Sequence, residues 1–190
     1  MAEPARRAAT YEDLIRLPEH LVGEIIDGDL YASPRPTPRH TVSSSGILIG
    51  VGGAFGGRAG GPPGPGGWWI LDEPELHLGA DVVVPDIGGW RRERMPKIPD
   101  EAFFSLAPDW VCEVISPSTE QIDRVRKKRV YARERVSHMW IVNPIAQTLE
   151  VLRLTGAFWQ EIGVFSGNDA INAEPFEAVT LEMARWWETE

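Results

Sequence analysis

Cysteine is almost absent from this chain of 190 residues, which has Cys112 and no other. A single thiol excludes an intrachain disulfide and a cysteine-rich zinc site. Long apolar runs are missing too: no segment approaches the length of a membrane span, and the first residues (MAEPARRAAT) lack the apolar stretch of a signal peptide. We therefore expect a cytoplasmic protein without a membrane segment.

Positive charge is also scarce. Lysine and arginine number 19 against 28 aspartates and glutamates, a net charge of −9, which argues against a protein that binds nucleic acid by bulk charge. The basic residues are nevertheless clustered, in one group between Arg91 and Lys97 and in a second between Glu120 and Arg135. The composition therefore leaves open a locally basic face on an acidic protein.

Turn-forming residues divide the sequence into short segments with strand or helix patterns. Asp27-Gly28-Asp29 is a strong tight-turn signal and predicts a hairpin, and the second half of the glycine-rich segment 46–67 is predicted to be a mobile loop. The predicted helices cover residues 11–17, 41–55 and 119–136, with a short amphipathic segment at 181–187. The predicted strands cover 22–26, 30–32, 68–71, 81–84, 110–115, 138–142, 148–154 and 158–165, and 88–107 is predicted to be irregular. This order predicts an α/β fold, a mixed β-sheet flanked by helices, in one domain over residues 1–190.

Two carboxylates stand in apolar surroundings. Asp86 follows the run 82–84, which consists of three valines, and Glu113 lies inside the apolar segment 110–115. An ionised carboxylate in an apolar strand is costly unless a partner or a metal compensates it. On position alone, a strand-end turn explains Asp86 better than a functional role does. The apolar flanks of Glu113 favour a functional role over that of an edge-strand residue reaching solvent.

A lysine follows these carboxylates, on the helix predicted over residues 119–136. Asp123, Lys127 and Tyr131 are spaced i, i+4, i+8 and share one stripe. The apolar face that this stripe borders is predicted to consist of Ile122, Val125, Val130 and Ala132. Lys127 is thus placed to reach inward, whereas Lys128 points to water. Without the neighbouring carboxylates, a solvated helix with an i,i+4 salt bridge would be the default interpretation.

Glu24 and His40 are weaker candidates. An exposed strand position explains Glu24 as well as a role in a site does, and His40, after Pro38-Arg39, has less support still. The other histidines show no metal-ligand spacing. The glycine-rich segment has neither GxGxxG between a strand and a helix nor the GK[ST] ending of a phosphate-binding loop, so nucleotide binding is unsupported.

Several short segments, taken together, resemble one known family. They are Glu24-Ile-Ile-Asp-Gly, Ser33-Pro…Arg39-His40, Val84-Pro-Asp86, Cys112-Glu-Val-Ile-Ser-Pro-Ser-Thr119, Asp123…Lys127…Tyr131-Ala and Met139-Trp-Ile-Val-Asn-Pro144. From about Tyr11 to Leu154 the chain resembles the Uma-type restriction endonucleases, a bacterial branch of the PD-(D/E)xK nuclease superfamily. The resemblance implies a restriction-endonuclease-like core, frequently assembled as a homodimer. The glycine- and proline-rich segment 52–67 departs from the family, which tends to have helix and a shorter loop there.

The resemblance also implies roles for individual residues. Asp86 and Glu113 match the metal-binding carboxylates, and Lys127 matches the motif lysine. Glu24 matches an additional acidic residue. The superfamily's usual lysine lies two positions after the glutamate, where this chain has Ile115. In this branch the lysine is displaced onto the following helix, which Lys127 matches.

The predicted function is a Mg²⁺-dependent (or Mn²⁺-dependent) endonuclease acting on nucleic acid, with DNA as the expected substrate. Asp86, Glu113 and the main-chain carbonyl of Val114 would hold the ion, which prefers oxygen ligands. Lys127 would orient or help to deprotonate the attacking water, and Glu24 would bind a second ion or a metal-bound water. Contacts to nucleic acid are predicted for Arg91, Arg92, Arg124, Lys128, Arg129 and His40. The alternative is a catalytically silent protein of the same fold that acts as a protein- or DNA-binding module.

Overall fold

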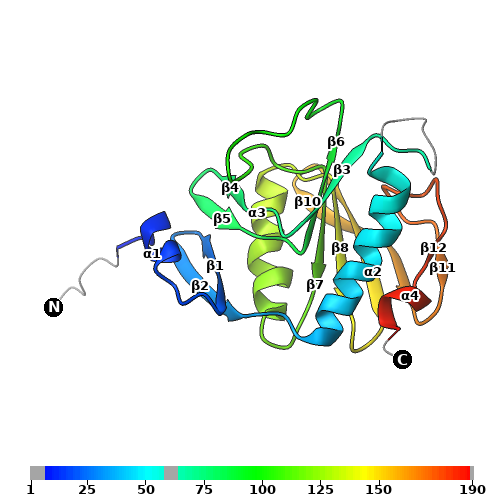
Figure 1. The fold of residues 1–190 in the computed structure, drawn as a ribbon, viewed down its shortest axis with the longest axis horizontal. Coiled ribbons are helices and arrows are strands. Elements are labelled where there is room, and N and C mark those ends of the chain that lie inside the picture. Colours follow the sequence, from blue (N-terminus) through cyan, green and yellow to red (C-terminus); the bar gives the residue numbers. More distant parts are fainter. Residues whose placement is uncertain (1–6, 58–63, 189–190) are drawn as a thin grey trace.

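The centre of the computed structural model, which describes residues 7–57 and 64–188, is a six-stranded sheet (Figure 1). Its strands are β3 (Trp68–Asp72), β6 (Ile87–Arg91), β7 (Trp110–Val114), β8 (His138–Asn143), β9 (Thr148–Thr155) and β10 (Phe158–Ser166). They are arranged in the order β10-β9-β8-β7-β6-β3, in which β7 and β8 run parallel and the other neighbours antiparallel. The sheet is therefore mixed, as predicted. The middle of the predicted loop, residues 58–63, lies outside the described residues.

A second, smaller sheet lies beside the first. Its strands are β1 (Leu21–Ile26), β2 (Asp29–Pro34), β4 (Leu76–Leu78) and β5 (Asp81–Val83), in the order β2-β1-β5-β4. The predicted β1–β2 hairpin is confirmed. Asp27 and Gly28 form its turn with φ values of 52° and 81°, the left-handed conformation that matches the twist of a two-residue hairpin.

Helices cover both faces of the large sheet. The helix α2 (Pro38–Phe55) packs on one face, together with the C-terminal helix α4 (Ala184–Trp187). The other face carries α3 (Lys128–Arg133), which continues a π-helical turn, η1 (Ile122–Lys127), and part of the small sheet. The predicted alternation along β7 is confirmed, because Trp110 and Cys112 pack toward α2 and Val111 packs toward α3.

The strand β6 corrects the prediction that residues 88–107 are irregular. Gly88 and Gly89 weaken the strand pattern of the sequence, yet both pair with β7. A Cβ atom at Gly88 would lie 2.8 Å from Pro74, and one at Gly89 would lie 2.9 Å from the ring of Trp110. Glycine occurs here because neighbouring side chains approach the strand closely, which a sequence pattern does not reveal.

The remaining elements are short. They are α1 (Tyr11–Ile15), β11 (Ala170–Ile171) and β12 (Leu181–Glu182), and the last of these precedes α4 in the segment predicted as amphipathic. The strand β4 was not predicted from the sequence. Within the part of the chain that the structure describes, no helix is both long and apolar enough to cross a bilayer.

Candidate active site

The site forms where the chain passes from the small sheet to the large one, through residues 84–86 between β5 and β6. Pro85 has no N–H group and cannot continue a ladder of hydrogen bonds. Pairing between β6 and β7 ends at Ile87 and Cys112. The main-chain groups of Val84 and Val114 next to this gap are therefore left for side chains to bind.

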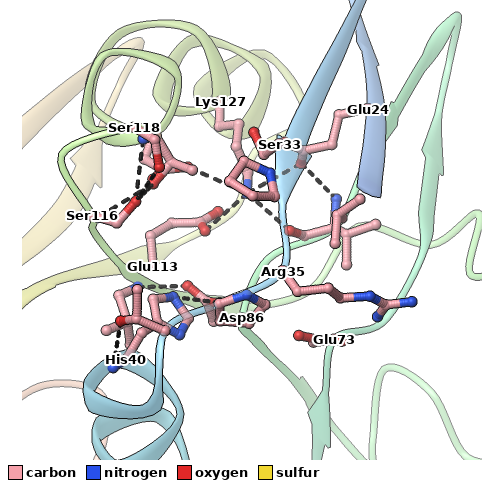
Figure 2. Close-up of a pocket in the computed structure, with 18 of the residues that line it drawn as sticks. Glu24, Ser33, Arg35, His40, Glu73, Asp86, Glu113, Ser116, Ser118 and Lys127 are labelled. Atoms are coloured by element: carbon pink, nitrogen blue, oxygen red, sulfur yellow. Dashed lines mark hydrogen bonds and ion pairs between the residues drawn. The ribbon is translucent and has the colours of Figure 1, made fainter. Parts of the chain in front are cut away.

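The ammonium group of Lys127 lies at the inner end of the site, surrounded by oxygen atoms (Figure 2). Its Nζ lies 2.8 Å from the carbonyl oxygen of Val84, 2.9 Å from Glu113 Oε2 and 3.1 Å from Glu24 Oε1. Asp123 Oδ1 lies 3.5 Å away. The structure thus brings together three predicted site residues (Glu24, Glu113 and Lys127) that come from β1, β7 and η1.

Both carboxylate oxygens of Glu113 are engaged. Tyr131 donates its hydroxyl hydrogen to Oε1 over 2.6 Å, and Lys127 donates to Oε2. Burial raises the pKa of Glu113, an effect that the ammonium of Lys127 opposes. Burial alone would lower the pKa of Lys127, but Glu113 and Glu24 outweigh it and the pKa is raised. Lys127 therefore keeps its proton at neutral pH.

Asp123 and Tyr131 complete this inner cluster. Both residues share the predicted stripe with Lys127, but no role is predicted for them from the sequence. Their i, i+4, i+8 spacing beside an apolar face is the pattern that could have indicated one. Burial raises the pKa of Asp123 from 3.8 to about 6. Val125 corrects the predicted apolar face, since 42% of it is exposed. It lies about half a turn from both Asp123 and Lys127 and so points away from the sheet.

Asp86 and His40 form the outer end of the site. Val114 donates its main-chain N–H to Asp86 Oδ2 over 2.6 Å, so the side chain continues the interrupted ladder. The other carboxylate oxygen, Oδ1, lies 3.1 Å from His40 Nε2. His40 is held in the first turn of α2, where Thr37 accepts its main-chain N–H. Burial would lower the pKa of His40, but Asp86 outweighs it and the pKa is raised.

One cavity of about 250 Å³ connects the two ends. Its acidic and basic lining residues are Glu24, Arg35, His40, Glu73, Asp86, Glu113, Asp123 and Lys127. Residues with hydroxyl groups also line the cavity, at Ser33 of β2, at Thr37 before α2, and at Ser116, Ser118 and Thr119 after β7. The arrangement offers carboxylates, hydroxyl groups and one buried ammonium around a space large enough for a small polar group.

Three of the four arginines predicted to contact nucleic acid interact with other groups of the protein. Arg124 binds Glu150 through both terminal nitrogens and Glu120 through Nε. Arg92 donates to the carbonyls of Trp68 and Gly56 and stacks on Trp69. The guanidinium of Arg91 lies over the ring of Trp68. The other two predicted contacts, Lys128 and Arg129, lie on α3, where Lys128 is half-buried and Arg129 is exposed.

The donor groups of the cavity are few for a divalent ion. Among residues 7–57 and 64–188, no three histidine, cysteine or acidic side chains are placed to hold a metal ion. The available donors are the carboxylate of Asp86, the main-chain carbonyl of Val114 and the remaining lone pairs of Glu113. The carbonyl of Val114 belongs to this set because it points to the same side of β7 as the N–H that binds Asp86. This set fits an ion that keeps several water ligands, as Mg²⁺ does.

A family model described as "Putative restriction endonuclease", Uma2, matches residues 8–184. The chain belongs to the Uma2 family. This Uma2 protein also resembles the crystal structure of a protein from Anabaena variabilis described as a putative nuclease belonging to DUF820, with a TM-score of 0.73 and 23% sequence identity. The likeness covers 94% of this chain and 97% of that one, and it shows the fold alone. A comparison with curated proteins gave no match. The predicted family and fold class are confirmed.

Proposed function

We propose that this Uma2 protein is a divalent-metal-dependent endonuclease that hydrolyses phosphodiester bonds in nucleic acid, with DNA as the expected substrate. The observation that carries the proposal is the gathering of Asp86, Glu113 and Lys127 around one cavity, with Glu24 beside them. A homodimer, a cytoplasmic location and one nuclease-like domain over residues 1–190 belong to the same proposal.

The proposed ligands are Asp86, Glu113 and the main-chain carbonyl of Val114, with water completing the coordination of Mg²⁺ or Mn²⁺. When bound, such an ion lowers the pKa of a water molecule and offsets negative charge on the phosphate. Glu24 faces the same cavity and is proposed to bind a metal-bound water or a second ion.

Lys127 acts through the carboxylates that it holds. Its ammonium donates to Val84 and Glu113 and lies beside Glu24, and the side chain is only 4% exposed. Because its pKa is raised, it does not accept a proton from water at neutral pH. This narrows the predicted role: Lys127 orients Glu113 and Glu24 and supplies a fixed positive charge near the phosphate.

One observation favours the alternative, a catalytically silent binding module. Tyr131 and Lys127 already hold both oxygens of Glu113, so the cluster is satisfied without an ion. A silent module would keep this cluster for stability and would not need to bind a metal. Metal binding and metal-dependent cleavage therefore separate the two functions.

The experiment compares wild type with Glu113→Gln on plasmid, linear duplex, single-stranded DNA and RNA, in Mg²⁺, Mn²⁺ or a chelator. We expect wild type to cleave at least one substrate only when metal is present, and the variant to lose about 100-fold or more in rate. Glu161→Gln, the same change at an exposed position of β10, is the control and should cleave like wild type. Cleavage that ignores both the metal and Glu113, in folded proteins, would refute the proposal.

A further inference from the structure

The imidazole of His40 lies beside the groups proposed to hold the ion. Its Nε2 is 3.1 Å from Asp86 Oδ1, and 10% of its side chain is exposed. Figure 2 shows the ring and the Asp86 carboxylate facing each other below Glu113.

The spacing of the two side chains suits a shared ion. Two ligands at adjacent positions of an octahedral ion, each about 2.1 Å from it, lie about 3 Å apart. The Nε2–Oδ1 distance of 3.1 Å matches that separation. Capping by Thr37 and the first turn of α2 hold His40 there, on a helix of 18 residues rather than on a loop.

The second ring nitrogen of His40 leaves the tautomer of the ring open. Nδ1 is buried and has no hydrogen-bond partner among the described residues. Because no partner fixes the tautomer, the ring can carry its proton on Nδ1 and present the Nε2 lone pair to an ion.

We propose that His40 is a further ligand of the divalent ion, beside Asp86 and the carbonyl of Val114. The inference rests on the proposed function and adds a nitrogen to its predicted oxygen ligands. Imidazole suits first-row transition metals, whereas Mg²⁺ prefers oxygen ligands. The site therefore prefers a transition ion such as Mn²⁺ to Mg²⁺. His40, predicted from the sequence as a nucleic-acid contact, is assigned instead to the ion.

The test is pulsed electron paramagnetic resonance of Mn²⁺ bound to tag-free protein, with and without ¹⁵N-labelled histidine, together with titrations of Mn²⁺ and Mg²⁺. It uses wild type, His40→Gln and His138→Gln. A glutamine at position 40 can still donate a hydrogen bond to Asp86 but has no ring nitrogen. His138, which lies 3.1 Å from Glu174 and does not line the cavity, is the matched control.

We expect a histidine nitrogen signal in wild type and His138→Gln and its loss in His40→Gln. The preference for Mn²⁺ over Mg²⁺ should fall at least about tenfold in His40→Gln. Losing even a residue that only supports a ligand costs about that much in metal affinity, and a direct ligand should cost no less. Bound Mn²⁺ without a nitrogen signal in wild type, a measurement that needs no variant, would overturn the inference and leave the proposed function standing. An equal signal in a folded His40→Gln would overturn it as well. Absence of binding by either ion would overturn both.

Discussion

The two ends of the cavity are both largely buried but differ in how their polar groups are satisfied. At the inner end, Lys127 and Tyr131 hold both oxygens of Glu113, whose side chain is 2% exposed. At the outer end, Asp86 is 17% exposed and meets one main-chain N–H and the ring of His40, whose second nitrogen is unsatisfied. The inner end is a cluster of buried charges that compensate one another. The outer end keeps lone pairs that are available to bind an ion.

This difference separates stability from chemistry. Removing one member of a compensated buried cluster leaves the other charges unpaired, which destabilises the fold strongly. At the outer end, a change such as Asp86→Asn removes the charge but keeps an oxygen that can accept the main-chain N–H of Val114. We therefore expect inner substitutions to affect unfolding most and outer substitutions to affect metal binding and cleavage most.

The largest effect on stability is expected from Lys127→Met. The change leaves Glu113, Glu24 and Asp123 in a buried space without their counter-ion. The free energy of unfolding at pH 7 should fall by about 3–5 kcal/mol, measured by chemical denaturation. Lys128→Met, the neighbouring position, should change it by less than about 0.5 kcal/mol. Similar losses from both variants would mean that the inner end is not a compensated cluster.

A smaller effect is expected from Asp123, through pH. Its pKa is raised from 3.8 to about 6, so the folded protein binds this proton more tightly than the unfolded chain does. The stability that this contributes is present at about pH 4 and below and is lost as pH rises through 6. Between pH 4 and 7, wild type should lose about 2–3 kcal/mol relative to Asp123→Asn, measured by denaturation across that range. If the free energies of unfolding of wild type and Asp123→Asn changed in parallel with pH, the raised pKa of Asp123 would be contradicted.

The smallest expected effect is on the salt dependence of DNA binding, in which two arginines of the same helical segment should differ. Arg124 is paired with Glu150 and Glu120, whereas Arg129 is exposed. In salt titrations of DNA binding, Arg129→Ala should reduce the slope by about one, and Arg124→Ala should leave it unchanged. A reduced slope for Arg124→Ala alone would show that its ion pairs open on binding and that the sequence-based assignment was right.

The sequence predicted those parts of the site that depend on local periodicity. Strand alternation placed Val111 opposite Trp110 and Cys112, and i, i+4 spacing placed Asp123 with Lys127. Glu113 was singled out because a carboxylate inside an apolar strand needs compensation, and the structure supplies it through Lys127.

Other features depend on contacts between distant segments, which no local pattern encodes. The approach of His40 to Asp86 joins the start of α2 to the end of a strand connection, and the pairing of Arg124 with Glu150 joins η1 to β9. The strand at Gly88 and Gly89 was missed because packing by Pro74 and Trp110, rather than a turn, selects glycine there.

Asp86→Asn provides the most direct test of the central claim, that an ion held by Asp86 and Glu113 drives phosphodiester hydrolysis. The variant keeps the shape of the side chain and removes the charge, so it should fold like wild type. The measurement is the rate of DNA cleavage as a function of Mn²⁺ concentration, with Mn²⁺ binding followed on the same samples. The account predicts saturable binding and cleavage for wild type and loss of both in Asp86→Asn. Wild type that neither binds Mn²⁺ nor cleaves, or a variant that cleaves at the wild-type rate, would contradict it.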